Sequence, residues 1–347
     1  MGYRRRMAWP GGILVGILAL IAAAAQAAVE DPTVTIFAGR DPQLSTQLAV
    51  GIEAGIFKKH GLSPQIQWQV TSVDLPNMIA SGQLNVFVPS HVQMAILRGQ
   101  GYPVYWVVTH TDVSGAQAFM LGPTGAAKVR EPKDIERLKI GALTGSNTAI
   151  LLENAGRLFG FDPTKAQYVN IGPPENVTAL AKGDIDAMGG WEPWLTNAVK
   201  SAPGARVYLS GSRSFIPGRE GPAKIMPHHT GLGVIKRYIE KNPETVRALV
   251  RAIVEATDYI NQDLERAIGM VSKQMRIPVE TLRETMPKNV YTAAVDRDTV
   301  EAARQFVDYF YKIKRIPKAP DPETFFYTKF LAEVDPALAK FSANEMR

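Results

Sequence analysis

The chain has 347 residues, of which 46% are hydrophobic and 21% are charged, and it contains no cysteine. The lack of cysteine excludes disulfides, a thiol nucleophile and a cysteine-ligated metal. Without the three arginines of an N-terminal leader, 36 Lys and Arg face 33 Asp and Glu, and this balance argues against a nucleic-acid binder. The remaining 320 or so residues exceed what one hydrophobic core usually organises, so we expect two domains.

The first 27 residues have the pattern of a secretory signal peptide. Three arginines at 4–6 precede an apolar run that ends in the small-residue site Ala25-Gln26-Ala27. The run is shorter than the roughly 20 residues that a membrane helix needs. We therefore expect cleavage after Ala27 or Ala28 and export to the periplasm, with an uncleaved N-terminal anchor as the alternative.

Two stretches about 100 residues apart resemble each other, which indicates an internal repeat. The segments 79–86 and 180–187 both read apolar-Ala-x-Gly-x-apolar, a helix end followed by a glycine cap and a strand start. A helix expected over 46–55 has its counterpart over 148–156. Each copy therefore alternates strands and helices, which predicts two α/β lobes with mostly parallel sheets. The expected strands are 33–38, 65–69 and 85–88 in one copy and 139–142, 166–170 and 185–188 in the other.

In open parallel sheets, ligands bind outside the carboxyl ends of the strands. The loops that follow the six strands should therefore face each other across a cleft between the lobes. These loops are 39–43, 70–74 and 89–91 in the first copy and 144–148, 171–176 and 189–193 in the second.

The last third of the chain lacks this alternation. After a strand at 207–209 and a Gly/Pro-rich loop at 211–227, one more strand is expected at 230–235. Asn242 and Pro243 then open a long amphipathic helix, and further helices are expected over 264–274, 279–286 and 299–313. We expect this helical tail to pack back onto the first lobe, which makes that lobe discontinuous in sequence.

The turn from Thr144 to Thr148 is the clearest candidate for a binding site. Thr144, Ser146, Asn147 and Thr148 immediately precede an apolar helix, so their side chains can cap it. The same position leaves backbone N–H groups at the positive end of the helix, where an anion can bind. Both roles are compatible, because side chains can cap while N–H groups hold a ligand.

Trp191 and Glu192 lie in the last of these loops. An exposed Trp191 would offer a flat wall for a ligand, whereas the alternative is a core tryptophan that covers the end of the sheet. Glu192 stands near a helix start, where a carboxylate is stabilised with or without a ligand. A contact between Glu192 and a cationic or donor group of the ligand is the alternative reading.

The histidines do not form a metal motif. None of the five has a second histidine or a carboxylate at helical ligand spacing, and no phosphate-binding or hydrolase motif is present. His91 follows a strand in a cleft loop and could contact a ligand or pack at a helix start. One residue of the pair His228-His229 could donate a hydrogen bond to a ligand, and we expect this residue to be His229.

Taken together, these segments resemble one family of known proteins. The chain is similar to the periplasmic substrate-binding proteins of ABC importers for nitrate, sulfonates, taurine and thiamine precursors, a branch of the type II periplasmic-binding fold. The likeness covers the mature chain. The stretches that carry it are Ala54–Leu62, Met78–Val86, Lys139–Ser146, Gly183–Ala187 with Trp191–Trp194, and Asn242–Leu249.

The resemblance implies a ligand clamped between two lobes that are joined near 121–125 and 224–231. Residues 28–122 and 228–347 would form lobe 1, and residues 123–227 would form lobe 2, after a signal peptide over 1–27. Together with the loops above, it gives the expected ligand-binding residues Arg40, Gln43, Ser72, Ser90, His91, Thr144, Ser146, Asn147, Thr148, Trp191, Glu192 and His229.

We therefore expect an exported binding protein, monomeric and without metal or cofactor, that captures a small organic anion and passes it to an ABC transporter permease. The anion would be sulfonate-like or aromatic carboxylate-like. The alternative is an exported enzyme that uses the same cleft, either a hydrolase or a relative of the thiamine-precursor synthases. Those synthases carry a cysteine cluster that this chain lacks. Delivery to a separate membrane sensor also remains open.

Overall fold

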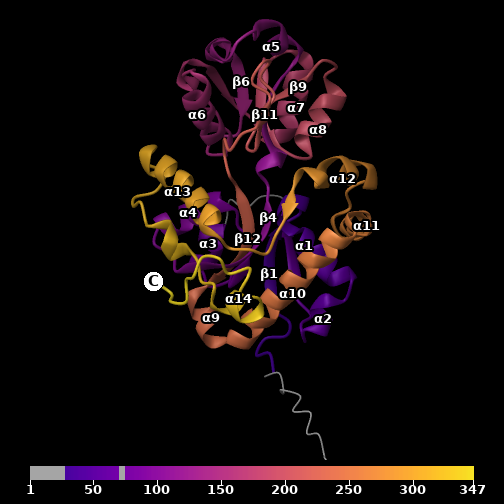
Figure 1. Cartoon of the computed structure of the whole chain (residues 1–347), viewed down its shortest axis with the longest axis vertical. Coiled ribbons are helices and arrows are strands. Elements are labelled where there is room, and N and C mark those ends of the chain that lie inside the picture. The colour runs from indigo at the N-terminus through magenta and orange to yellow at the C-terminus, as the bar shows by residue number, and fades with distance from the viewer. Residues whose placement is uncertain (1–27, 70–74) are drawn as a thin grey trace, which may run out of the picture.

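Two α/β lobes lie end to end in the computed structural model, which describes residues 28–69 and 75–347 (Figure 1). The predicted signal peptide lies outside the described residues. The first lobe contains a six-stranded sheet with the order β13-β4-β12-β3-β1-β2. Its strands are β1 (Thr35–Gly39), β2 (Gln65–Gln69), β3 (Val86–Phe87), β4 (Val104–Asp112), β12 (His229–Ile235) and β13 (Val290–Tyr291).

Helices from both ends of the described chain cover this first sheet. The N-terminal ones are α1 (Pro42–Glu53), α2 (Ile56–Lys59), α3 (Leu75–Ala80) and α4 (His91–Gly99). The C-terminal ones are α9 (Lys236–Lys241), α10 (Pro243–Gln262), α11 (Leu264–Met275), α12 (Val279–Thr285), α13 (Arg297–Lys312) and α14 (Lys329–Val334).

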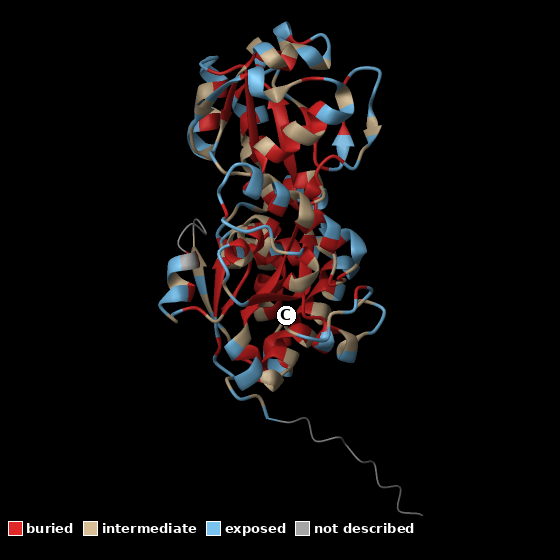
Figure 2. Ribbon diagram, turned by 90° about the vertical axis from the view of Figure 1, so that its left-hand side faces the viewer, coloured by how far each residue is buried: buried red, intermediate tan, exposed pale blue. Residues whose placement is uncertain are grey.

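The second lobe contains a seven-stranded sheet with the order β11-β10-β9-β5-β8-β6-β7. Its strands are β5 (Gln117–Leu121), β6 (Lys139–Ala142), β7 (Gln167–Asn170), β8 (Ala187–Trp191), β9 (Arg206–Ser210), β10 (Arg213–Ser214) and β11 (Gly221–Pro222). Its helices are α5 (Pro123–Lys128), α6 (Thr148–Phe159), α7 (Pro173–Lys182) and α8 (Trp194–Ser201). The central strands β4, β5 and β12 are buried, whereas the edge strands β2, β7 and β11 are partly exposed, as are loops and outer helix faces (Figure 2).

The internal repeat is confirmed. In the first lobe β1 pairs in parallel with β2 and β3, and in the second lobe β6 pairs in parallel with β7 and β8. The glycines that mark the repeat adopt the same left-handed backbone, with φ of 75° at Gly82 and 76° at Gly183. A side chain would be strained there, so glycine ends the helix at the same point of each copy.

Both sheets are mixed, so the expectation of mostly parallel pairing is wrong outside the repeat. The strands β4, β12 and β13 of the first lobe pair antiparallel. In the second lobe β5 pairs antiparallel with β8 and β9. The strands β4 and β5 flank the first crossing between the lobes, and β12 follows the second.

Two segments cross between the lobes. The first is 113–116, with a short 3₁₀ turn at Ser114–Ala116, and the second is 223–228. The expected first crossing at 121–125 is wrong, because β5 already pairs within the second sheet. The boundary of the first lobe therefore falls after β4 rather than at 122.

The C-terminal helices pack back onto the first lobe, as predicted. The long helix α10 contacts α1 and α14, and α13 contacts α4. Two of these helices also reach the second lobe, because α12 contacts α8 on one flank and α13 contacts α6 on the other. Asn242 makes no side-chain cap at the start of α10, where the Glu30 carboxylate instead accepts from the N–H groups of Glu244 and Thr245.

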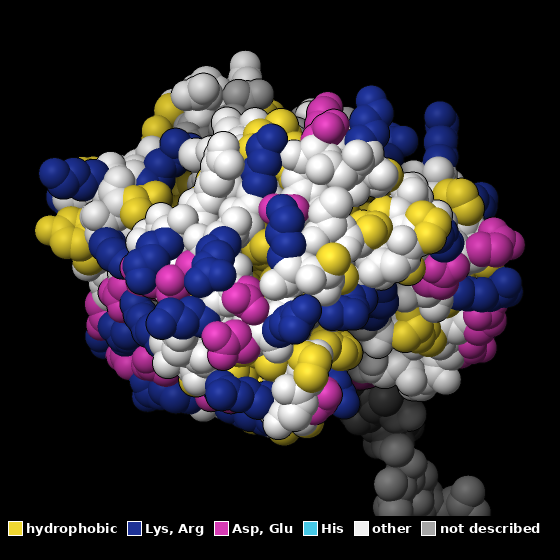
Figure 3. Space-filling view, turned by 90° about the horizontal axis from the view of Figure 1, so that it is seen from above, with side chains coloured by type: hydrophobic (Ala, Val, Ile, Leu, Met, Phe, Trp, Pro, Cys, Tyr) yellow, Lys and Arg dark blue, Asp and Glu magenta, His cyan; other side chains and the backbone are white. Residues whose placement is uncertain are grey.

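The surface at the end of the second lobe mixes both signs of charge. Lys and Arg side chains are interspersed with Asp, Glu and apolar side chains on this face (Figure 3). Within the described residues, no helix is both long and apolar enough to cross a membrane.

Candidate functional site

Three buried amide side chains connect the two lobes, and two of them belong to the predicted site. Gln43, in the first turn of α1, donates from Nε2 to the Glu192 carbonyl of the second lobe at 2.7 Å. Gln43 Oε1 accepts from Gln117 Nε2, and Gln117 Oε1 accepts from Asn147 Nδ2. We call Gln43, Gln117 and Asn147 the amide chain. It joins the start of α1, the start of β5 directly after the first crossing, and the start of α6.

The loop before α4 lies next to the amide chain, because Thr230 contacts both Ser90 of this loop and Gln43. The Thr230 hydroxyl donates to the Gln43 carbonyl at 2.9 Å, and the backbones of Thr230 and Ser90 form an isolated antiparallel bridge. Ser90 caps α4, because its Oγ accepts from Val92 N and its N–H donates to Gln93 Oε1 at 2.8 Å. The predicted Ser90 is therefore near the amide chain, with its own hydroxyl occupied as a helix cap.

His91, His228 and His229 form a buried cluster beside this loop. The ring centroid of His91 lies 5.7 Å from that of His228 and 5.3 Å from that of His229, and it stacks on Trp106 at 5.2 Å. The atoms His91 Nε2, His228 Nδ1 and His229 Nδ1 are buried without a hydrogen-bond partner among the described residues.

Burial lowers the pKa of all three histidines, that of His228 to about 3, so their rings are neutral at pH 7. In the described part of the chain, no group of three or more His, Asp or Glu side chains is arranged to hold a metal. The histidine cluster therefore offers neutral donors and acceptors rather than charge.

The start of α6 differs from the expectation of side-chain capping. Asn147 occupies the cap position, but its side chain makes no capping bond, and its Nδ2 donates to Gln117 Oε1 instead. Ser146 Oγ and Thr148 Oγ1 are buried and lack a partner among the described residues. A Cβ at Gly189 would lie 1.9 Å from the Thr148 methyl carbon, so glycine is required for this close approach. Two unpartnered hydroxyls thus lie at a helix N-terminus.

Glu192 is held by the protein itself. Its carboxylate accepts from Thr196 N at 3.0 Å and forms an ion pair with Lys288 Nζ, and the residue is 3% exposed. Lys288 also contacts Thr196 Oγ1 at 3.2 Å. Because each carboxylate oxygen has a partner within the protein, these contacts favour a structural role for Glu192 over contact with a ligand.

Asp41, which the sequence analysis did not select, is the other carboxylate of this region. It caps α1, with Oδ1 accepting from Gln43 N at 2.8 Å and from Gln43 Nε2 at 3.4 Å. Burial and, to a lesser extent, the charge of Glu192 raise the pKa of Asp41 to about 6, against the opposing effect of the Gln43 hydrogen bonds. No cationic side chain pairs with Asp41 among the described residues.

The remaining predicted residues lie outside these contacts. Arg40 is exposed, and its backbone N–H donates to Gln69 O at 2.9 Å, whereas its side chain makes no hydrogen bond or ion pair with a described residue. Thr144 is exposed and its N–H donates to Asn170 Oδ1. Trp191 is half-buried at the end of β8, paired with Gln117. Ser72 lies outside the described residues.

The predicted set lacked Gln117, Lys288 and Asp41. Gln117 begins β5 directly after the first crossing, where no loop pattern marks it. Lys288 reaches Glu192 from 96 residues further along the chain, so no local pattern could indicate it. Asp41 was visible as a polar residue directly before a helix, and an N-cap signal could have selected it.

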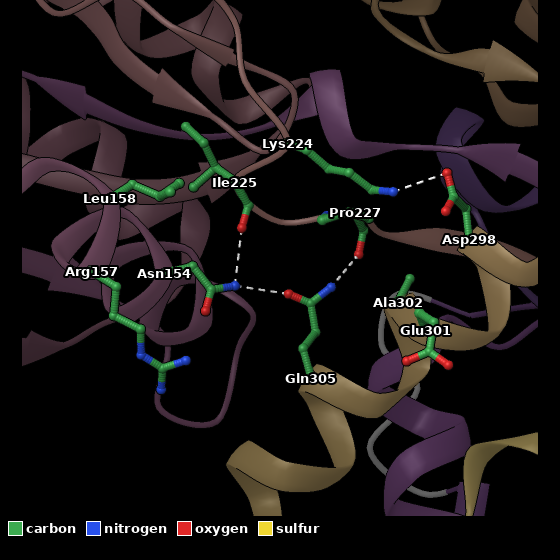
Figure 4. Close-up of a pocket in the computed structure, with 10 residues that line it drawn as sticks. All are labelled: Asn154, Arg157, Leu158, Lys224, Ile225, Pro227, Asp298, Glu301, Ala302 and Gln305. Carbon is green, nitrogen blue, oxygen red and sulfur yellow. Dashed lines mark hydrogen bonds and ion pairs between the residues drawn. The ribbon is translucent and has the colours of Figure 1, made fainter.

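A pocket of about 350 Å³ opens on the flank where α6 faces α13 (Figure 4). Asn154 Nδ2 donates to Gln305 Oε1 at 2.8 Å, and Gln305 Nε2 donates to the Pro227 carbonyl at 2.7 Å. Lys224 pairs with Asp298 at 2.9 Å. None of the predicted site residues lines this pocket, and its amides are occupied by each other and by the second crossing.

Comparison with known proteins gives relatives with named binding functions. A putative binding protein of Brucella abortus is 24% identical over 259 residues, which cover 70% of each chain. The periplasmic aliphatic sulphonate-binding protein SsuA from Escherichia coli has a similar structure, with a TM-score of 0.71, 16% identity, and coverage of 85% of this chain and 97% of its own.

An enzyme shares the fold more distantly. The structure of the desulfurization enzyme DszB matches with a TM-score of 0.59 and 12% identity, over 88% of this chain and 99% of its own. At such identities the structural likeness shows the fold alone, and it confirms the predicted two-lobed periplasmic-binding architecture. The sequence profile of the NMT1-like family matches residues 41–271, more than half of the chain. This chain belongs to the NMT1-like family.

Proposed function

We propose that this protein is the solute-binding component of an ABC importer, exported through its N-terminal leader and active in the periplasm as a monomer. It encloses a small organic molecule between its lobes and delivers it to a membrane permease. The observation that carries the proposal is the amide chain, which joins helix starts of both lobes beside two hydroxyls that have no partner in the described part of the chain. The named binding functions of the relatives support it.

The ligand carries an anionic group in this proposal. Ser146 Oγ and Thr148 Oγ1 have no hydrogen-bond partner among the described residues, and they lie at the start of α6, where free backbone N–H groups and the helix dipole favour negative charge. The name of SsuA, an aliphatic sulphonate binder, points to the same class. Lobe closure on the ligand would shift an equilibrium between open and closed forms.

A calorimetric and thermal-shift panel of alkyl sulfonates, nitrate, aromatic carboxylates and pyrimidines tests this function. We expect saturable binding of one class, without turnover of the ligand. Formation of a product on incubation would instead establish the enzyme alternative. Absence of binding across the panel, with a folded protein, would contradict the anion proposal.

The Ser146→Ala/Asn147→Ala double variant tests the position of the ligand. We expect an anionic ligand to bind more weakly by roughly 1 to 3 kcal/mol, because charge-assisted hydrogen bonds are lost and the helix start is loosened. Thr144→Ala is the matched control, since Thr144 is an exposed hydroxyl of the same turn. Unchanged affinity in the double variant would show that this turn does not hold the ligand.

A further inference from the structure

One segment of the first lobe contacts the second lobe on both flanks. Residues 284–312, which run from the end of α12 to the end of α13, reach α8 on one flank and α6 on the other (Figure 1). We call this segment the clasp. One part of the clasp touches the first crossing, at 113–116, and another part touches the second crossing, at 223–228.

Lys288 forms the first arm of the clasp. Its Nζ pairs with the Glu192 carboxylate and contacts Thr196 Oγ1 at 3.2 Å, so the side chain holds the start of α8. The backbone of the same residue packs on the first crossing. A Cβ at Gly115 would lie 2.5 Å from the Lys288 carbonyl oxygen, so this approach requires glycine. Lys288 therefore contacts the second lobe and the first crossing at once.

Gln305, on α13, forms the second arm. Its Nε2 donates to the Pro227 carbonyl of the second crossing at 2.7 Å, and its Oε1 accepts from Asn154 Nδ2 of α6 at 2.8 Å (Figure 4). Asn154 Nδ2 also donates to the Ile225 carbonyl at 3.0 Å, so the two amides bind the second crossing at two points. This arm, like the first, joins one crossing to one helix of the second lobe.

We propose that the clasp sets the angle between the lobes, with Lys288 and Gln305 as its two positioning residues. Lobes of this kind move relative to each other by bending the segments that join them, and each arm fixes one such segment to a helix of the second lobe. Release of one arm therefore frees the flank on which it lies and leaves the other flank held. The inference concerns the movement of the lobes, so it can fail without affecting the proposed binding function.

Two other ion pairs join the same flanks and provide matched controls. Lys200 pairs with Glu284 at 2.7 Å between α8 and α12, and Lys312 pairs with Glu153 at 3.0 Å between α13 and α6. Among the described residues, neither lysine side chain bonds to a crossing. The lysine side chains are 51% and 64% exposed, and ion pairs so open to solvent contribute little.

Distances between pairs of spin labels, measured by double electron–electron resonance on the protein without ligand, test the inference. The chain contains no cysteine, so labels attach only to cysteines that are introduced. Val199→Cys with Glu280→Cys reports on the flank between α8 and α12. Leu158→Cys with Tyr311→Cys reports on the flank between α6 and α13. All four native side chains are exposed.

Each arm should control its own flank. Lys288→Met should add a second, longer distance between α8 and α12 and leave the other flank unchanged, and Gln305→Met should do the reverse. We expect the open form to gain about tenfold relative to the described form when the hydrogen bonds of one arm are lost. The controls Lys200→Met and Lys312→Met should keep the distances of the parent protein on both flanks.

Unchanged distances in both Lys288→Met and Gln305→Met overturn the inference, and a response in one variant alone overturns it for the other arm. A shift of both flanks after one substitution overturns the assignment of one arm to each flank. Equal shifts in the control variants overturn it too, because the contacts with the crossings would then not decide the angle. Asn154→Ala removes the second arm from the α6 side and should give the same result as Gln305→Met; a different result refutes the role of the two amides.

Discussion

Replacement of Asp41 by Asn should stabilise the protein at neutral pH. Burial raises the pKa of this carboxyl from 3.8 to about 6 in the folded state. The folded state therefore binds the proton more tightly than the unfolded state between those values, and stability falls as the pH rises through this window. Above pH 6 the ionised Asp41 side chain lowers the stability of the folded state by up to about 3 kcal/mol. This value is an upper limit, because Asp41 is half-buried and water screens part of the effect.

The assay is urea unfolding, between pH 4 and pH 8, of the wild type, Asp41→Asn and the matched control Asp263→Asn, which removes the same charge from the cap of α11. We expect the free energy of unfolding of Asp41→Asn to equal that of the wild type near pH 4. The difference in favour of the variant should grow up to about pH 6 and stay constant above it. The cap of α1 persists, because Asn Oδ1 can accept from Gln43 N as the carboxylate does. The reasoning is refuted if Asp41→Asn is no more stable than the wild type at pH 7.5, or if its gain does not depend on pH.

Two further substitutions test the contacts between the lobes by the same unfolding assay. Gln117→Leu leaves Gln43 Oε1 and Asn147 Nδ2 buried without partners, so it should lower the free energy of unfolding by about 2 to 4 kcal/mol. A decrease below about 0.5 kcal/mol would contradict the hydrogen bonds of the amide chain. Lys288→Met leaves the Glu192 carboxylate without its ion-pair partner and should lower the free energy of unfolding by about 1 to 3 kcal/mol. The loss should be smaller than for breaking a fully buried ion pair, because the Lys288 side chain is 40% exposed. The Glu192→Gln/Lys288→Met double variant should be more stable than Lys288→Met alone, and the reverse order would refute the ion pair.

The fold could be predicted to a large extent because the sequence patterns that mark its helices and strands are local and occur in two copies. The copies at 79–86 and 180–187 carry the same glycine, and both glycines adopt the left-handed backbone that the pattern requires. The strand β2 (Gln65–Gln69) begins and ends where the sequence placed it. The strands at 207–209 and 230–235 were predicted, but their antiparallel pairing was missed, because pairing direction depends on where the chain crosses between the lobes and no local pattern shows that.

The candidate site could be predicted only in part. Gln43, Asn147 and Glu192 follow strands of the repeat, so the rule for parallel sheets located them. Gln117 and Lys288 come from the crossing segment and from a distant helix region, and they enter the site through long-range packing alone. Glu192 also shows that position does not fix a role, because Lys288 occupies the carboxylate that a ligand was expected to meet.

The structure of a complex with the tightest binder of the ligand panel tests the central claim most directly. The account predicts that the ligand lies between the lobes, with its anionic group on Thr148 Oγ1 and the first turn of α6, beside Gln43 and Asn147. A ligand bound instead in the pocket between α6 and α13, lined by Asn154 and Gln305, would contradict the account.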